Sequence, residues 1–488
     1  MTREVLRDSL IYLPAKVVPA LAGIVAIPIF TNLLTPEIYG QYLFFLTVLT
    51  LISTFCTSWL SSVTVRFGNV GDANLLHNKL KNILSIALIV SILIWFVVSS
   101  TLPQTGNHSL LLVAGAFWLI AQGLFDYYAV WLRVKNKPFS YSVAISWRSI
   151  GGLVVASIFL LAYSREASGI FISFAFIMFV GLHFIVRKAI DDQPIGALLS
   201  KKSAVDFKSI LVYGIPTALT SLTLAGLSYA DRLLINAIMG FESVAIYGAN
   251  YDIAEKTIFF VNSMLLLSSS IIGIRIYESQ GEKDAYEFLS KLIRLYLILT
   301  PPLVLVLALM YKEIVGLLLP TVYQSGAVVL PIVAFGGLFV GILHRYSLAL
   351  SFHKRTDTIM LCSFGALSVN LIACFFLIPL YGLIGSAIGT LTAYVAWLVF
   401  IRVASSRYFS ISFPWHTFIR VFLSLSVVAI FALFIKSHFD FQKSFSIFII
   451  CVIVAIFYPA LLFVSGEVNR NEINNMLNIF KNRLEAKS

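Results

Sequence analysis

Fourteen apolar runs, most of them about 20 residues long, constrain this chain more than any other feature. An α-helix needs about 20 apolar residues to cross the hydrocarbon core of a bilayer, which is about 30 Å thick. Lipid offers no partner for backbone N–H and C=O groups, so a run of this kind crosses as a helix. We therefore expect an all-α polytopic membrane protein with about 14 transmembrane helices. The runs lie near 10–34, 41–63, 82–102, 110–132, 140–163, 168–186, 210–236, 244–274, 291–311, 327–350, 358–379, 383–401, 419–435 and 445–464.

The composition excludes several classes of protein. Hydrophobic residues make up 59% of the 488 residues and charged residues 12%, whereas an average soluble domain is about 45–50% apolar and about 25% charged. A soluble enzyme, a disordered chain and a nucleic-acid-binding protein are therefore poor interpretations. The first run is also no cleavable signal, because it is too long, contains Lys16 and lacks a small-residue cleavage site.

The cysteines point to no metal or disulfide site. All of them lie in apolar runs and none forms a C-x-x-C motif, so we expect buried thiols. They are Cys56, Cys362, Cys374 and Cys451.

The positive charges predict an orientation. If the N-terminus is cytoplasmic, 27 of the 35 Lys and Arg residues, Arg345 among them, fall in cytoplasmic segments and four in external ones. This bias predicts an even number of spans with both termini in the cytoplasm, and it explains the net charge of +12 without a nucleic-acid partner. The tail predicts a helix on the inner membrane surface; its apolar face would hold Ile473, Met476, Leu477, Phe480 and Leu484.

Two short patterns occur twice along the chain. The sequence I-Y-L-P-A at Ile11–Ala15 is echoed by V-Y-G-I-P-T-A at Val212–Ala218. The sequence E-I-Y-G-Q-Y at Glu37–Tyr42 is echoed by A-I-Y-G-A-N-Y at Ala245–Tyr251. The spacing favours two six-helix lobes in the same orientation, followed by two further helices, and such lobes can rock about the seam between them to give alternating access.

The predicted organisation has five parts. We expect an N-terminal six-helix lobe over 1–190, a cytoplasmic linker over 191–209 and a C-terminal six-helix lobe over 210–402. Helices 13 and 14 follow over 403–464, and a cytoplasmic amphipathic tail covers 465–488.

Basic residues inside the spans predict a cationic cavity. An ionised side chain in the bilayer is costly unless it faces protein or water. A lumen lined by Lys and Arg favours a phosphate-bearing passenger, because guanidinium groups match phosphate oxygens. The candidates for substrate binding are Lys16, Arg148, Arg232 and Lys256.

Two of these four basic residues have a specific alternative role. Arg148 lies about 12 Å into its span at about 1.5 Å per residue, and it could instead form a structural ion pair with Asp126. Lys16 lies near the start of its span, so its ammonium could reach the inner surface by snorkelling.

Acidic residues inside the spans are candidates for ion coupling, namely Glu255, Asp252 and Asp126. Asp252 precedes Lys256 by four residues, so the two can pair along one helix face. Glu255 then lacks a local partner and could bind H⁺ or Na⁺, or it could pair with Arg232. For the adjacent Asp231 and Arg232 we favour a structural role.

Three motifs resemble one known family. N-L-L-T-P-E-I-Y-G-Q-Y (Asn32–Tyr42) resembles the junction of spans 1 and 2 in Wzx-type polysaccharide flippases. Y-G-I-P-T-A-L (Tyr213–Leu219) and A-D-R-L-L-I (Ala230–Ile235) are similar to their span 7. The segment Val369–Thr390 resembles their hairpin of spans 11 and 12. The resemblance extends over nearly the whole chain.

The resemblance implies a fold and a function. The fold would be that of the multidrug/oligosaccharidyl-lipid/polysaccharide (MOP) exporters. The function would be to flip an undecaprenyl-pyrophosphate-linked oligosaccharide from the cytoplasmic to the periplasmic leaflet of a bacterial inner membrane, coupled to an ion and with no other cofactor. Partners would be the lipid-linked substrate, membrane lipid, and possible polymerase and chain-length regulator proteins.

Aromatic residues within the spans could stack on sugar faces, although most should serve packing or the interface belt. They are Tyr39, Trp59, Trp118, Trp147, Tyr229 and Tyr251.

Other functions remain open. A lipid II flippase or a drug/cation antiporter of the same superfamily is the main alternative. A membrane polysaccharide polymerase or ligase is more remote, because no external loop is long enough to carry a catalytic set of residues.

Overall fold

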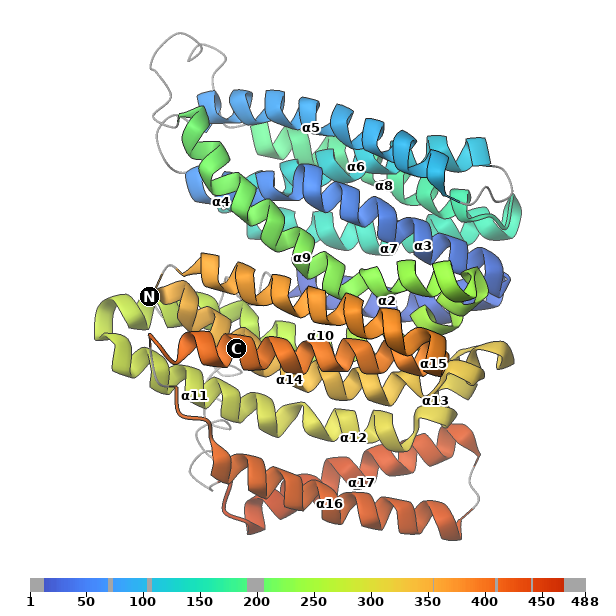
Figure 1. Cartoon of the computed structure of the whole chain (residues 1–488), viewed down its shortest axis with the longest axis vertical. Helices are drawn as coiled ribbons and strands as arrows, with labels where there is room; N and C mark the ends of the chain where they lie inside the picture. Colours follow the sequence, from blue (N-terminus) through green and yellow to red (C-terminus); the bar gives the residue numbers. More distant parts are fainter. Residues whose placement is uncertain are drawn as a thin grey trace, which may run out of the picture.

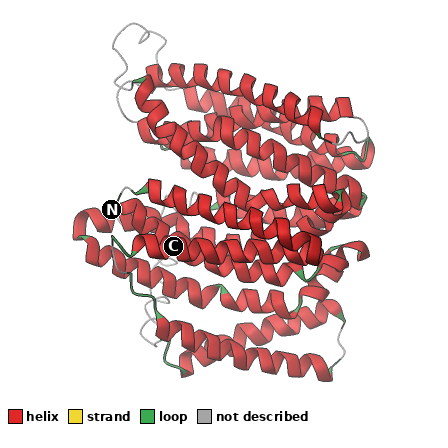
Figure 2. Cartoon of the chain, viewed as in Figure 1, coloured by secondary structure: helices red, strands yellow, loops and turns green. Residues whose placement is uncertain are grey.

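The computed structural model describes residues 13–68, 73–102, 108–190, 206–353, 355–408, 411–439 and 442–468. Over these residues every regular element is a helix, short loops join the helices, and no strand forms (Figure 2). The apolar face predicted for the tail lies outside them, as does the linker segment 191–205.

The helices fall into three sets along the chain. The N-terminal group contains α2 (Pro14–Leu33), α3 (Pro36–Ser53), η1 (Thr54–Ser58), α4 (Trp59–Phe67), α5 (Ala73–Thr101), α6 (His108–Val134), α7 (Pro138–Ala162) and α8 (Ala167–Ile190). The C-terminal group contains α9 (Phe207–Met239), α10 (Phe241–Gln280), α11 (Glu282–Leu299), α12 (Pro301–Leu309), α13 (Tyr311–Leu318), η3 (Thr321–Gly326), α14 (Val329–Phe352) and α15 (Thr356–Ser405). The last set is α16 (Trp415–His438) and α17 (Lys443–Val464).

The predicted membrane spans all fall on these helices. Among the described residues, 12 helices are long and apolar enough to cross a membrane. That count takes α15 once, although α15 covers two predicted spans, 358–379 and 383–401. The helix bends at Gly382, whose φ of 58° suits glycine. The predicted span 244–274 lies on α10, which is not one of the 12. The all-α membrane fold is therefore confirmed.

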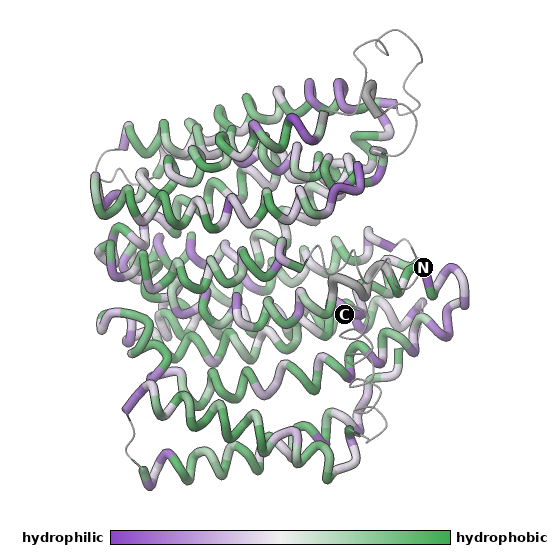
Figure 3. Tube along the Cα trace, turned by 180° about the vertical axis from the view of Figure 1, so that it is seen from behind, coloured by the Kyte–Doolittle hydropathy of each residue, from purple (hydrophilic) through white to green (hydrophobic). Residues whose placement is uncertain are grey.

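The helices run roughly side by side (Figure 1). Helices α5, α6 and α8 lie at one side of the molecule, α16 and α17 at the other, and α10, α11, α12 and α14 between them. Green apolar segments run along the helices, while many of the purple hydrophilic ones lie near the ends (Figure 3). Large apolar side chains such as Ile86, Leu380 and Ile430 are exposed. An exposed apolar surface of this extent suits contact with lipid acyl chains, as expected for a multi-pass membrane protein.

The two helix groups meet most closely where α3 packs on α10. A Cβ atom added to Gly40 would lie 1.8 Å from the carbonyl oxygen of Phe241, so the two backbones touch there. A Cβ atom added to Gly248 would lie 2.5 Å from Cδ1 of Leu43. Both glycines of the repeated Tyr-Gly pattern therefore lie in one contact between α3 and α10. The boundaries predicted for the lobes stay predictions.

One expectation about burial was wrong. Cys56, Cys362 and Cys374 are buried, but Cys451 is exposed, because α17 lies at the edge of the molecule and packs on one side only.

Arg345, counted above on the cytoplasmic side, is fully buried in the protein. Helix α14 continues to Phe352 and so holds this residue inside the C-terminal group.

Polar partners make the burial of Arg345 possible. Its Nη1 donates to Oδ1 of Asn262 and to the carbonyl oxygen of Gly341, both at 2.5 Å. Its guanidinium carbon lies 4.5 Å from the ring centroid of Tyr296. These contacts replace part of the hydration that a buried cation loses.

One buried carboxylate, that of Glu467, ties α16 and α17 to the rest of the molecule. It accepts hydrogen bonds from Arg294 Nε of α11 at 2.7 Å, from Thr417 Oγ1 of α16 at 2.6 Å and from Arg420 Nη1 of α16 at 3.2 Å. Burial by itself raises the pKa of Glu467, but the hydrogen bonds from Arg294, Thr417 and Arg420 outweigh it, so the pKa lies below its ordinary value.

We expect the hydrogen bonds of the Glu467 carboxylate to make the stability of the protein depend on pH. A lowered carboxyl pKa contributes stability above the ordinary value of about 4.3, and that contribution is lost as the pH falls through the lowered native value. Glu467→Gln should therefore lower the melting temperature of the purified protein in detergent at pH 7 and flatten its decline in acid. The exposed ion pair of Glu287 with Lys291 supplies the control. An equal loss in Glu287→Gln would contradict this account.

Candidate functional site

One carboxylate in the C-terminal group pairs with two cations. Asp252 Oδ1 accepts from Arg232 Nη2 at 2.5 Å, and Oδ2 accepts from Lys256 Nζ at 2.9 Å. Arg232 comes from α9 and the other two residues from α10. Asp252 is 7% exposed and Arg232 1%. We call these three residues the triad. The predicted pair of Asp252 with Lys256 is confirmed, and Arg232 pairs with Asp252 rather than with Glu255.

The triad lies next to the N-terminal group. The side chain of Lys256 passes Gly23 of α2, where an added Cβ atom would lie 3.0 Å from its Cε. Tyr39 and Tyr42 of α3 lie within electrostatic range of both Asp252 and Arg232. Two of the four predicted basic residues, Arg232 and Lys256, therefore lie close to the contact between the two groups.

A second polar cluster surrounds Asp231. Its Oδ2 accepts from Tyr247 Oη at 2.5 Å and from Thr390 Oγ1 at 3.5 Å, and its Oδ1 accepts from the backbone N–H of Arg232. Asn370 Nδ2 donates to Thr390 Oγ1 at 3.3 Å. Asn370 Oδ1 and Ser386 Oγ are buried and have no hydrogen-bond partner among the described residues. The sequence indicated no role for these two, because each is a single polar residue in an apolar run.

Arg148 and Asp126 form an ion pair within the N-terminal group. Arg148 Nη1 of α7 lies 2.9 Å from Asp126 Oδ1 of α6, and Gln122 Nε2 donates to Asp126 Oδ2 at 2.6 Å. The guanidinium carbon also lies 5.3 Å from the ring centroid of Phe125. This is the ion pair that the sequence offered as the structural alternative. Both charged side chains stay partly exposed, so the guanidinium keeps capacity for a further anion.

Lys16 stands apart from the other predicted basic residues. It lies two residues after Pro14, at the start of α2, and its side chain is exposed. It makes no ion pair with another described residue. The structure thus links Arg232 and Lys256 through the carboxylate of Asp252 and pairs Arg148 with Asp126. Lys16 lies in the first turn of α2.

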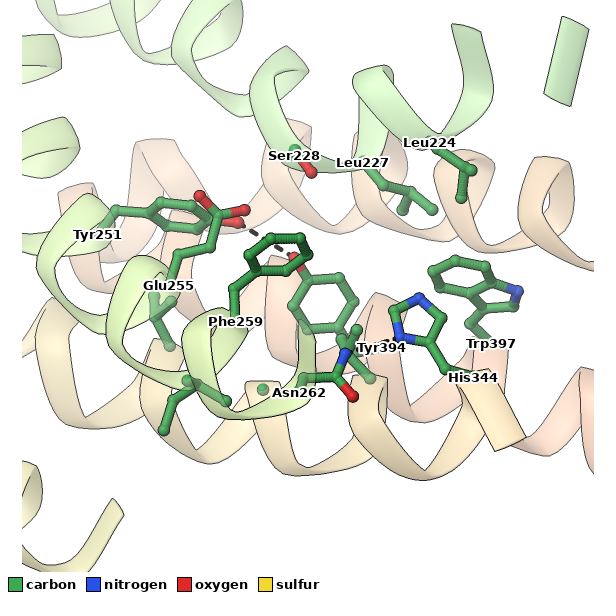
Figure 4. Close-up of a pocket in the computed structure, with 14 residues that line it drawn as sticks. Leu224, Leu227, Ser228, Tyr251, Glu255, Phe259, Asn262, His344, Tyr394 and Trp397 are labelled. Atoms are coloured by element: carbon green, nitrogen blue, oxygen red, sulfur yellow. Dashed lines mark hydrogen bonds between the residues drawn. The ribbon is translucent and has the colours of Figure 1, made fainter. Parts of the chain in front are cut away.

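Glu255 lines a cavity of about 240 Å³ inside the C-terminal group (Figure 4). Its carboxylate forms no hydrogen bond or ion pair with another described residue, in contrast to Asp252 and Asp126. The cavity lies between α9, α10, α14 and α15 and also contains Tyr251, one of the aromatic residues singled out above. The described residues contain no group of three His, Cys, Asp or Glu side chains that could hold a metal ion.

The other singled-out aromatic residues serve packing contacts. Tyr39 and Trp118 are buried. Trp59 packs against Gly214, and Tyr229 lies beside the Arg232 guanidinium. Trp147 is partly exposed, but its Nε1 donates to the carbonyl oxygen of Ile177 at 3.1 Å. Among the six, only Tyr251 lines the described cavity.

We expect Arg148→Gln to abolish complementation of a strain that lacks the gene and Arg148→Lys to keep part of it, because only lysine preserves the charge. Asp126→Asn distinguishes a role of Arg148 in substrate binding from a structural role in its ion pair with Asp126. If the guanidinium contacts the substrate, Asp126→Asn should keep more activity than Arg148→Gln, because the cation remains. Equal losses at equal membrane levels of protein would reduce Arg148 to a structural role. Complementation of a strain that lacks the gene measures all three variants.

Residues 5–269 match the family described as polysaccharide biosynthesis protein. No match was found among the curated protein sequences.

The fold is similar to that of several solved transporters. The lipid II flippase MurJ, in an inward closed conformation, shares 16% identity; the match covers 93% of this chain and 98% of that one with a TM-score of 0.73. An inward-facing multidrug resistance transporter of the MATE family, a member of the MOP superfamily, shares 14% identity over 82% of this chain and 98% of that one, with a TM-score of 0.55. A MATE transporter of Vibrio cholerae shares 12% identity over 83% and 96%, with a TM-score of 0.57. At these identities the similarity shows a shared fold.

Proposed function

Because the chain belongs to the polysaccharide biosynthesis protein family, we propose that it flips undecaprenyl-pyrophosphate-linked oligosaccharide repeat units from the cytoplasmic to the periplasmic leaflet. Such units supply O-antigen, capsule or exopolysaccharide. The observation that carries the proposal is that a member of a polysaccharide family matches the fold of a named lipid flippase over 93% of its length. The membrane would be the bacterial inner membrane, with both termini in the cytoplasm.

The charges support an anionic passenger. A prenyl tail can remain in lipid while the pyrophosphate and the sugars need a polar path between the leaflets. Arg232 and Lys256 lie beside the N-terminal group and share one carboxylate between two positive charges. A pyrophosphate would meet the partly exposed ammonium of Lys256 there, and Arg148 and Lys16 would extend the cationic path.

Coupling to H⁺ or Na⁺ is part of the proposal. Asp252 and Asp126 are held in ion pairs, so Glu255 is the candidate with a carboxylate left for a cation. Asp231, with the buried oxygen of Asn370 nearby, offers a second set of oxygen atoms. Hard cations such as Na⁺ favour ligands of this kind. No other cofactor is proposed, and the chain would act as a transporter rather than an enzyme.

Other functions in this superfamily predict different chemistry. A drug/cation antiporter would favour carboxylates and aromatic residues over basic ones at its binding site. A lipid II flippase would share the anionic passenger and would be essential for cell-wall synthesis. A polymerase or ligase would need a catalytic set on an external segment. A polymerase and a chain-length regulator would be partners of a flippase.

Deletion of the gene tests the proposal. We expect lipid-linked repeat units to accumulate in the cytoplasmic leaflet and surface polysaccharide to be lost, with both effects reversed by a plasmid-borne copy. Mass spectrometry of extracted lipids and staining of surface polysaccharide measure the two effects. Normal surface polymer in a clean deletion would overturn the proposed function, and arrest of cell-wall synthesis would favour lipid II as the substrate.

A further inference from the structure

The cavity beside Glu255 has the lining of a binding site. It lies among helices distant in sequence and is walled by four aromatic rings, those of Tyr251, Phe259, Tyr394 and Trp397. Figure 4 shows these rings spread along the cavity from one end to the other rather than gathered around one point. Leu224 and Phe259, which belong to the lining, are 40% and 51% exposed. The cavity is therefore not sealed inside the C-terminal group.

Polar groups stand at both ends of this aromatic wall. Glu255 and Ser228 lie near Tyr251 at one end, and neither side chain hydrogen-bonds to a described residue. His344 lies near Trp397 at the other end, and its Nδ1 is engaged by Asn262 Nδ2 at 2.9 Å. That bond leaves the second ring nitrogen of His344 available.

Trp397 forms one end of the aromatic wall, beside His344, and is only 4% exposed. Its Nε1 is buried and points away from the other lining residues, so the indole offers the cavity its ring rather than a hydrogen bond. Tyr251 and Tyr394, in contrast, join their hydroxyl groups at 3.1 Å, which holds two of the rings in place.

We propose that this cavity receives one sugar residue of the transported oligosaccharide. A pyranose ring has an apolar C–H face that packs on aromatic rings and a rim of hydroxyl groups that need acceptors and donors. The aromatic wall meets the first need, and Glu255, Ser228 and His344 meet the second. A volume of about 240 Å³ accommodates one sugar ring. The inference rests on the proposed function, because it places part of that substrate.

The arrangement of the aromatic rings favours a sugar over an organic cation. Two cations (Arg232, Lys256) and two carboxylates (Asp252, Asp231) act on the Glu255 carboxylate, so charge alone does not choose between the two ligands. An ammonium cage places its rings around a single point, whereas these rings lie in a row. Glu255 and Lys256 are consecutive in α10, so the cavity and the triad lie within one turn of the same helix, on different faces of it.

Binding of simple glycosides to the purified full-length protein in nanodiscs tests the proposal. The probes are the methyl glycosides of glucose, galactose and N-acetylglucosamine, with tetramethylammonium as the rival ligand. Saturation-transfer NMR reports which probe protons touch the protein. At least one glycoside should bind, and Trp397→Ala should weaken its binding about tenfold, the factor that corresponds to about 1.4 kcal/mol. Trp415→Ala is the matched control, because Trp415 is 63% exposed on α16 and lies outside the cavity lining.

A second variant distinguishes a lost binding contact from a loss of folding. Glu255→Gln keeps the size of the side chain and should weaken glycoside binding about tenfold while the melting temperature stays near that of the parent protein. Binding of tetramethylammonium without any glycoside would overturn the proposal, and so would glycoside binding that neither Trp397→Ala nor Glu255→Gln reduces. If the parent gene restores surface polysaccharide in the deletion strain while no glycoside binds, the sugar site fails and the flippase function stands. Normal polysaccharide in the deletion strain contradicts the function itself.

Discussion

Gly40→Leu should abolish export, because Gly40 is where the backbones of the two helix groups touch. A Cβ atom there would lie 1.8 Å from the carbonyl oxygen of Phe241 and 2.5 Å from its carbonyl carbon. Backbone atoms cannot swing aside as a flexible side chain does, so α3 and the start of α10 must separate. If transport requires the groups to rock, the conformation in which they touch is lost. We expect surface polysaccharide to fall at least about a hundredfold, which corresponds to about 2.8 kcal/mol against that conformation.

The repeated pattern supplies the matched control. A Cβ atom at Gly248 would meet the Cδ1 atom of Leu43 at 2.5 Å, and the end of a leucine side chain can move. Gly248→Ala should therefore retain most of the activity, whereas Gly40→Ala should already lose much of it. Surface polysaccharide at matched protein levels in the membrane gives the comparison. Full export by Gly40→Leu would show that the contact between α3 and α10 does not matter for transport.

Asp252→Asn should cause the second large effect, a loss of both stability and export. The carboxylate of Asp252 pairs with both Arg232 and Lys256, and Arg232 is almost completely buried. Removing one partner of a buried ion pair typically costs about 3–5 kcal/mol, because it leaves an uncompensated charge. Arg232 Nε already lacks a partner among the described residues, so this site has few other ways to stabilise the guanidinium. The melting temperature of the purified protein in detergent should fall strongly.

Lys256→Gln separates the structural role of the triad from its proposed role in binding. The side chain of Lys256 is 30% exposed, and Asp252 keeps its bond to Arg232 when the lysine is lost. The melting temperature should therefore change little, while export falls if the ammonium contacts the pyrophosphate. Unchanged export by Lys256→Gln would remove this lysine from the proposed path. If Asp252→Asn melts at the same temperature as the parent protein, Asp252 does not stabilise the fold by compensating the buried charge of Arg232.

Contacts within one helix were predictable from the sequence, and contacts across helices only in part. The bond of Asp252 to Lys256 follows from a spacing of four residues. The pairing of Arg148 with Asp126 could be named only as an alternative, because it depends on how α6 and α7 are rotated. Pairing of Arg232 with Glu255 was one of two alternatives for that acid, and Arg232 pairs with Asp252 instead. Asp252 and Glu255 are three positions apart on α10. The hydropathy of the sequence does not show which of the two acids faces Arg232.

The amino-acid sequence by itself determined the class of fold, the helical spans and the family resemblance, because lipid selects apolar helices one segment at a time. The tertiary structure alone decided which charges meet, which thiol faces outward, and that residues between Leu224 and Trp397 enclose one cavity. These features depend on the rotation and depth of each helix relative to its neighbours. Side-chain packing between helices sets both, and no single segment of the chain contains that information.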